Sequence, residues 1–102
     1  MIIGENIRIQ GTIEGEEDLV VRGRVQGTVR LQGGLVVEAG AWLIGDAHVH
    51  QAQIHGTVRG NVNARDGIEV SRTGRMLGDA VAPRVTIAAG AAFRGRVEMG
   101  DL

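Results

Sequence analysis

Hydrophobic and polar residues alternate along several segments of the chain. Aliphatic residues or glycine occupy every second position in residues 7–13, 21–29 and 54–62, with polar residues between them. A period of two places successive side chains on opposite faces of a β-strand. The sequence has no sustained stripe of apolar residues at helical spacing. The pattern therefore predicts short strands with one buried and one solvent-exposed face, and no long helix.

These strands recur with a period of about 17 residues. Two independent series of positions mark the period. The aliphatic series is Val21, Val37, Ile54, Val70 and Ile87, and the glycine series is Gly11, Gly27, Gly45, Gly60, Gly78 and Gly95. A repeat of three short strands separated by tight corners is typical of one turn of a β-solenoid, in which each turn pairs with the next.

We therefore predict an all-β fold: one domain over residues 1–102, formed by a right-handed parallel β-helix (β-solenoid). It has about six turns of roughly 17 residues, with three short strands in each turn. A left-handed hexapeptide solenoid requires an aliphatic residue at every sixth position. Ile44-Gly45 begins such a repeat, but His50 occupies the next required position. This interruption favours the right-handed coil.

Composition narrows the choice of fold further. The chain contains 17 Gly, one Trp, one Phe and no Tyr. Glycine inside a helix costs roughly 0.5–1 kcal/mol per residue, so a helical bundle is disfavoured. The scarcity of aromatic residues fits a narrow core filled by small aliphatic side chains. The chain also lacks Cys, which excludes a disulfide framework and a thiolate metal site.

The charges give little indication of a charged partner. The formal net charge is −1, from 11 basic and 12 acidic residues that are mixed along the sequence. We therefore expect no nucleic-acid partner. The longest apolar run is far below the ~20 residues of a membrane span, and no secretory signal pattern is visible.

The expected ends of the solenoid differ from its sides. Charged residues at outward positions protect the sides against lateral pairing, whereas the segments before Ile7 and after Met99 are too short to form capping helices. Protected sides and unprotected ends predict end-to-end polymerisation of the chain with itself. We expect the contact residues to be Ile2, Ile3 and Ile7 at one end and Phe93, Val97 and Met99 at the other.

No group of side chains indicates catalysis, a cofactor or a metal. His48 and His50 share one face of a strand, as metal ligands can, but no third ligand stands at a clear spacing, so we interpret them as exposed strand residues. The acidic residues 16–18 are interpreted as a solvated corner. Trp42 is interpreted as a corner or core filler. The Gly-x-Gly patterns precede no helix, so we expect no nucleotide site.

The segment from Gly4 to Val29, and above all residues 11–21, resembles the bactofilins, which are bacterial polymer-forming cytoskeletal proteins. The resemblance covers nearly the whole chain. It implies a right-handed triangular β-helix that assembles without nucleotide into nonpolar filaments through like-to-like end contacts. It also implies a cytoplasmic location at the inner face of the membrane, where the filaments organise cell shape or cell-wall enzymes. Bactofilins often have a Phe in the last turn that serves the C-terminal contact, and Phe93 matches it.

The chain departs from the bactofilin pattern in its tails. Bactofilins commonly carry flexible tails, one of which can bind membrane, whereas here the solenoid pattern begins almost at Met1 and continues almost to Leu102. The tails are thus either missing from this member or trimmed, and residues 1–3 offer only a weak apolar membrane contact. The alternative function is an oligomeric solenoid enzyme of the carbonic-anhydrase or acyltransferase type, with sites between subunits. The broken hexapeptide pattern and the missing metal triad favour a structural protein without enzymatic activity.

Overall fold

The computed structural model of the protein describes residues 2–99 of the chain. These residues form a single sheet of 13 strands in which neighbouring strands are parallel, and none of them is helical. In chain order the strands are β1 (Ile2–Ile3), β2 (Arg8–Gly15), β3 (Leu19–Val21), β4 (Arg24–Leu31), β5 (Gly34–Val37), β6 (Trp42–Ile54), β7 (Thr57–Arg59), β8 (Val62–Val70), β9 (Arg75–Leu77), β10 (Ala80–Ala82), β11 (Val85–Ile87), β12 (Ala92–Arg94) and β13 (Val97–Met99).

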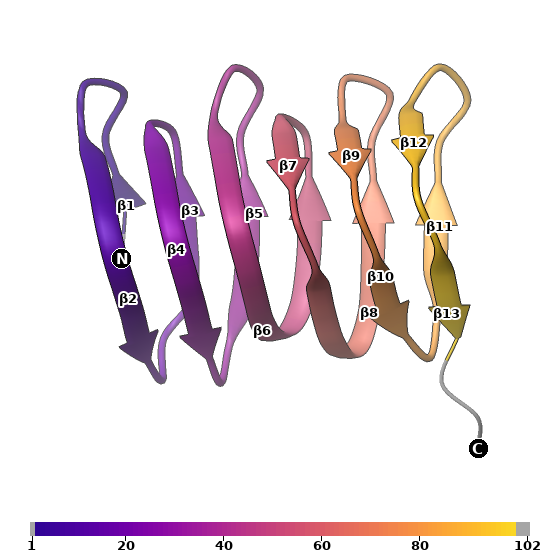
Figure 1. Ribbon diagram of the computed structural model, residues 1–102, viewed down its shortest axis with the longest axis horizontal. Coiled ribbons are helices and arrows are strands. Elements are labelled where there is room, and N and C mark those ends of the chain that lie inside the picture. Colours follow the sequence, from indigo (N-terminus) through magenta and orange to yellow (C-terminus); the bar gives the residue numbers. More distant parts are fainter. Residues whose placement is uncertain (1, 100–102) are drawn as a thin grey trace.

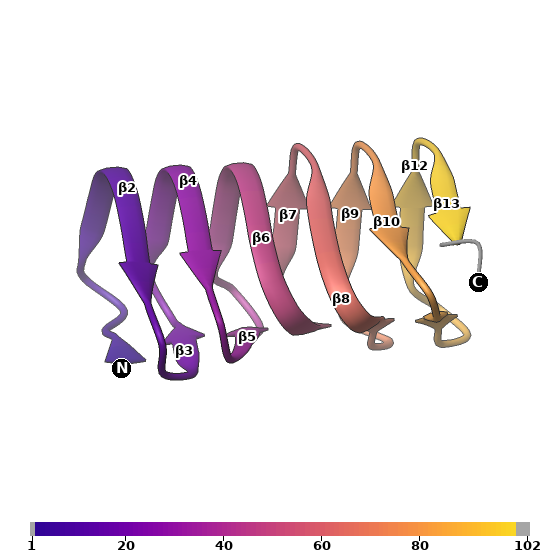
Figure 2. The ribbon, with the colours of Figure 1, turned by 90° about the horizontal axis from the view of Figure 1, so that it is seen from below.

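The sheet is wound into a right-handed coil. In Figure 1 the nearer strands β2 and β4 run downwards, the more distant strands β3 and β5 run upwards, and the chain advances from left to right. Figure 2 shows the same hand from a perpendicular direction. The coil has about six turns of about 17 residues, which confirms the predicted β-helix. Its principal extents are 35 × 28 × 17 Å.

Each turn has three faces. The first is formed by the start of β2, β4 and β6 and by β7, β9 and β12, the second by the strand segments that follow, and the third by β1, β3, β5, β11 and the ends of β6 and β8. The chain passes from the first face to the second without leaving the strand in β2, β4 and β6. We refer to these as the first, second and third faces.

The aliphatic series predicted from the sequence forms one column on the inner side of the third face. Each member pairs with its counterpart in the next turn, in the order Ile3, Val21, Val37, Ile54, Val70 and Ile87. All of them from Ile3 to Val70 are buried in the core. Residues separated by one period of the predicted repeat are therefore strand-pairing partners in successive turns.

The glycine series forms a second column, at the corner between the first and second faces. Its six members have φ values between +126° and +138°, a region that side chains other than glycine rarely adopt. The turns also approach closely here. A Cβ atom added at Gly27 would overlap the carbonyl oxygen of Gly11, and the same overlap recurs from turn to turn up to Gly95 above Gly78. Glycine is therefore required by both the backbone conformation and the spacing of the turns.

Strand β8 continues without a loop through residues 65–67. The register between β6 and β8 shifts between Val49 and Gln51, so that an additional residue of β8 is accommodated as a bulge. This turn of the solenoid is therefore one residue longer, yet the chain stays in the sheet. The flanking residues Ala64 and Ile68 remain buried in the core.

The glycine column gives a matched pair of substitutions. Gly60→Ala introduces a Cβ atom against the backbone of the preceding turn, whereas Gly11→Ala meets no atom within 4 Å. Both variants bear the cost of a left-handed φ, about 1–3 kcal/mol. We expect Gly11→Ala to lower the free energy of unfolding by about that amount and Gly60→Ala to lower it considerably more. Urea unfolding followed by circular dichroism measures both, and equal losses would contradict the steric role of the column.

Candidate functional site: the two ends of the solenoid

Each end of the solenoid presents strands that are paired on one side only. Within residues 2–99, β1 pairs with β3 and β2 with β4, and neither has a second neighbour. At the other end β11, β12 and β13 pair only with β8, β9 and β10 respectively. Edge strands carry backbone N–H and C=O groups that can pair with a further strand. Both ends therefore offer a template on which another sheet can stack.

The core reaches the surface at these ends. Inward columns of side chains run through the molecule, and their middle members are almost completely buried. The first-face column is Ile9, Val25, Leu43, Val58, Met76 and Phe93, the second-face column is Ile13, Val29, Ala47, Val62, Ala80 and Val97, and the third-face column ends at Ile87. Ile9, Ile13, Phe93 and Val97 are only partly buried, and Ile87 is 42% exposed. The end faces are thus cross-sections of the apolar core.

Ile7 adds a further apolar group to the first turn. In later turns its place at the corner before the first face is taken by Gly23, Ala41, Gly56, Gly74 and Ala91. The carbonyl oxygens of Ile7 and of the first four of these residues each accept a hydrogen bond from the following turn. A Cβ atom at Gly23 would overlap the carbonyl oxygen of Ile7, so the later turns require small residues. Ile7 meets no preceding turn among the described residues and remains 48% exposed.

The six predicted contact residues differ from one another in their position and in their exposure. Phe93 and Val97 lie in the last turn at the open end of the core, and Ile7 lies exposed in the first turn. Ile2 is 63% exposed, but it stands in register with Val20 on the outer side of the third face. Ile3 is only 3% exposed, because it closes the inner column of the same face. The side chain of Met99 lies outside the described residues.

Sequence reasoning missed Ile9, Ile13 and Ile87 as end residues. The signal was available: Ile87 is the last member of the aliphatic series, while Ile9 and Ile13 begin the two columns that end at Phe93 and Val97. Ile9, Ile13 and Ile87 are terminal members of their columns and are partly or largely exposed, whereas Ile3, at the other end of the third-face column, is buried. Counting columns rather than termini would therefore have identified these three residues.

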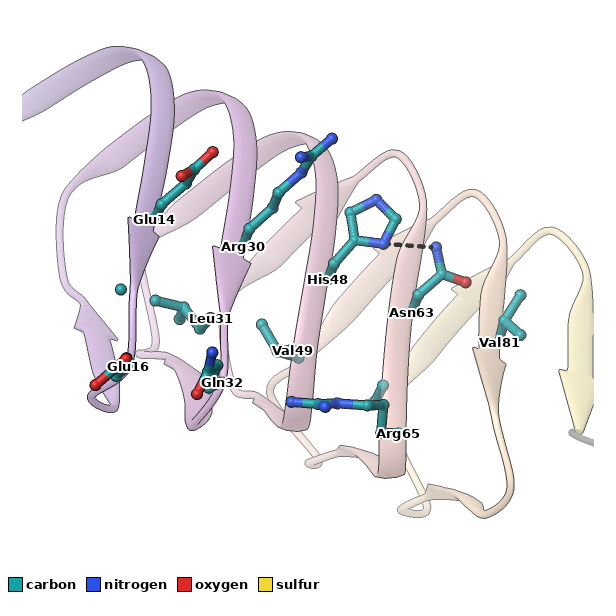
Figure 3. A pocket seen from close by; sticks show the side chains of 12 residues that line it. Glu14, Glu16, Arg30, Leu31, Gln32, His48, Val49, Asn63, Arg65 and Val81 are labelled. Carbon is teal, nitrogen blue, oxygen red and sulfur yellow. Dashed lines mark hydrogen bonds between the residues drawn. The ribbon is translucent and has the colours of Figure 1, made fainter.

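The sides of the solenoid carry an open groove along the second face. Glu14, Arg30, His48 and Asn63 occupy one register position in four successive turns and line a groove of about 680 Å³ (Figure 3). The polar contact between them is a hydrogen bond of 3.4 Å between His48 Nδ1 and Asn63 Nδ2. No nucleophile is paired with a base in this groove. Within residues 2–99, no group of three or more acidic, His or Cys side chains could hold a metal ion.

Two residues that were interpreted as generic have defined contacts. Asp18 does not form a purely solvated corner, because its Oδ1 accepts a hydrogen bond of 2.7 Å from the backbone N–H of Gly34 in the next turn. Trp42 is not a core filler: it lies between the buried Ala41 and Leu43, so it points outwards, and it is 39% exposed. The guanidinium of Arg24 stands 5.6 Å from the centre of its ring.

Comparison with known proteins agrees with this architecture. Residues 1–98 match the Bactofilin family, described as polymer-forming cytoskeletal. Bactofilin BacP of Myxococcus xanthus is 48% identical over 101 residues, which are 99% of this chain and 42% of BacP. Bactofilin BacO of the same organism is 42% identical over 98 residues, which are 96% of this chain and 78% of BacO. This chain thus spans less than half the length of BacP.

A solved structure shares the same fold throughout. It is the cryo-EM reconstruction of Thermus thermophilus bactofilin double helical filaments, with a TM-score of 0.91 and 25% identity. The match covers 97% of this chain and 98% of the Thermus chain. The Thermus chain with this fold is the subunit of a filament, and the present chain belongs to the bactofilin family. The family is described as polymer-forming and cytoskeletal, which favours a structural role over the alternative of a solenoid enzyme. Within residues 2–99 no helix is long and apolar enough to cross a membrane.

The edge strands make a prediction for hydrogen exchange. About half of the backbone amides of an edge strand point away from its single partner. On assembly we expect new protection in β1, β2, β12 and β13, while β6 is already protected in the unassembled subunit. Hydrogen–deuterium exchange with mass spectrometry before and after polymerisation measures this. New protection confined to lateral loops, with none in the edge strands, would contradict the assignment of the ends as contact sites.

Proposed function

We propose that this protein is the subunit of a cytoskeletal filament that assembles end to end, without nucleotide, through its two apolar end faces. The filament lies in the cytoplasm at the inner face of the membrane and acts as a scaffold for cell shape or for cell-wall enzymes. The observation that carries the proposal is the coincidence of edge strands and open core columns at both ends.

The chemistry of the ends supports assembly without an energy source. The contact joins aliphatic and aromatic side chains such as Ile9, Ile13, Phe93 and Val97, and burying apolar area is favourable by roughly 25 cal/mol per Å². Edge strands can add main-chain hydrogen bonds across the junction. Both contributions are present in the folded subunit, so no bound nucleotide is needed to create the contact surface.

The proposed filament is nonpolar, with N-terminal ends joined to N-terminal ends and C-terminal ends to C-terminal ends. The resemblance to bactofilins supports this arrangement. A like-to-like contact is isologous, which requires each end face to be complementary to itself. Flat cross-sections of an aliphatic core meet this requirement, because they carry few charges to repel one another. The three lateral faces then remain available for membrane and enzyme partners.

Phe93 gives a direct test of the C-terminal contact. Phe93→Arg places an unpaired charge in the contact, which costs about 3–5 kcal/mol, so we expect the concentration required for polymerisation to rise at least about 100-fold. The matched control is Thr86→Arg, an exposed outward position in the same turn. Negative-stain microscopy without nucleotide measures filament formation in each variant. Filaments of normal length from Phe93→Arg would contradict the proposal, as would their loss in Thr86→Arg.

The oligomers formed by end variants test the polarity. In a nonpolar filament, Phe93→Arg retains the N-terminal contact and forms dimers, and Ile9→Arg at the other end also forms dimers of its own. In a head-to-tail filament, each variant alone is monomeric and only a mixture of the two forms dimers. Analytical ultracentrifugation of each variant and of the mixture distinguishes the two arrangements. Dimers that appear only in the mixture would overturn like-to-like assembly.

A further inference from the structure

The first face of the solenoid separates charges that are mixed in the sequence. Its outer side carries two columns of side chains, and each turn contributes one residue to each column. The columns are Arg8, Arg24, Trp42, Thr57, Arg75 and Ala92, and Gln10, Gln26, Ile44, Arg59, Leu77 and Arg94. Five of these twelve residues are arginines and none is acidic, although the whole chain has a formal net charge of −1. We call this surface the arginine face.

The arginines of this face are available for an external partner. Arg8, Arg24, Arg59, Arg75 and Arg94 are all exposed. Within residues 2–99 the one ion pair joins Arg84 to Asp66, at 3.3 Å, and involves none of them. Acidic residues occur at the two borders of the face: Asp46 and Asp79 follow the glycine column, and Glu5 and Glu38 lie at the opposite corner. Glu5 lines a pocket with Arg8 and Arg24 but forms no ion pair with either.

Apolar groups lie among these arginines. Trp42 is 39% exposed and Leu77 is 37% exposed. Ile44, Arg59 and Leu77 are consecutive members of one column, so an arginine stands between two apolar side chains. Arg59, Arg72, Arg75 and Arg94 line a shallow groove of about 690 Å³ together with Trp42 and Leu77. A surface that is both basic and apolar fits a partner with anionic groups above a hydrocarbon layer.

We propose that the arginine face docks on a membrane surface containing anionic phospholipid. Guanidinium groups pair with lipid phosphates, and Trp is favoured at the level of the headgroups. A nucleic acid fits less well, because Arg24 already covers the Trp42 ring and the basic columns are interrupted by Trp42 and Ile44. A second copy of the same face would bring arginines against arginines. The inference rests on the proposed function, because it specifies which face of the filament meets the membrane.

Polymerisation should strengthen the attachment. A single subunit offers five arginines, each of which contributes only about a fivefold gain in partitioning to an anionic surface. Subunits joined in one filament bind as a multivalent unit, whose avidity exceeds that of any member by orders of magnitude. Filaments are therefore expected to bind the membrane under conditions in which isolated subunits do not.

The test is flotation of the purified chain with vesicles of phosphatidylglycerol and phosphatidylcholine, compared with vesicles of phosphatidylcholine alone. We expect binding to the anionic vesicles only, a loss of binding in high salt, and a blue shift of the fluorescence of Trp42, the single tryptophan. The double variant Arg59→Gln, Arg75→Gln should lower the partition coefficient about 25-fold. The matched control, Arg30→Gln with Arg65→Gln, removes the same charge from exposed positions lining the second-face groove.

Several outcomes would overturn the inference. Equal losses in the two double variants would show a general charge effect, and a loss in Ile2→Gln alone would place the contact at the apolar first residues. Tighter binding of single-stranded DNA than of anionic vesicles at the same salt concentration would favour a nucleic-acid partner. Negative-stain microscopy of the same samples separates the two proposals. Filaments that fail to float would refute only the membrane-facing role, whereas floating protein that forms no filaments would refute only end-to-end assembly.

Discussion

The close stacking of backbone at the glycine corner is the constraint on which the rest of the fold depends. Each turn places the carbonyl oxygen of one glycine where the next turn would need a Cβ atom, and the backbone there has a φ near +130° that only glycine adopts readily. The corner fixes the distance between turns and the alignment of the first two faces. The inward columns follow from this alignment, because residues at the same distance from the glycine are brought into register.

The same constraint explains why the ends differ from the sides. Every turn is built to receive a turn on either side, so the first and last described turns each retain an unused edge and an open core. The lateral faces have neither an unpaired strand edge nor an open core, and their outward positions are largely polar or charged. The filament-forming role of the bactofilin family thus fits a repeat in which no segment within residues 2–99 covers the end strands.

Much of the fold could be predicted from the sequence, because the glycine series and the aliphatic series both repeat with the register of the sheet. The candidate contact residues stay predictions, and the structure gives only their positions. Phe93, Val97 and Ile7 lie at the ends, but Ile3 is buried and Ile2 points sideways, since proximity to a chain terminus does not determine on which side of a strand a residue lies. The outward direction of Trp42 follows from its alternation with Ala41 and Leu43. The arginine face was hidden because its members are spread over 87 positions of the sequence, from Arg8 to Arg94, and come together only when the turns are stacked.

A cryo-EM reconstruction of filaments assembled from this chain tests the central claim most directly. The account predicts that the axis of each solenoid runs along the filament and that strand pairing at roughly 4.8 Å continues across the junctions between subunits. It also predicts that Phe93 and Val97 are buried at one junction and Ile9 and Ile13 at the other. Solenoids lying across the filament axis, with contacts through their lateral faces and with open ends exposed to solvent, would contradict it.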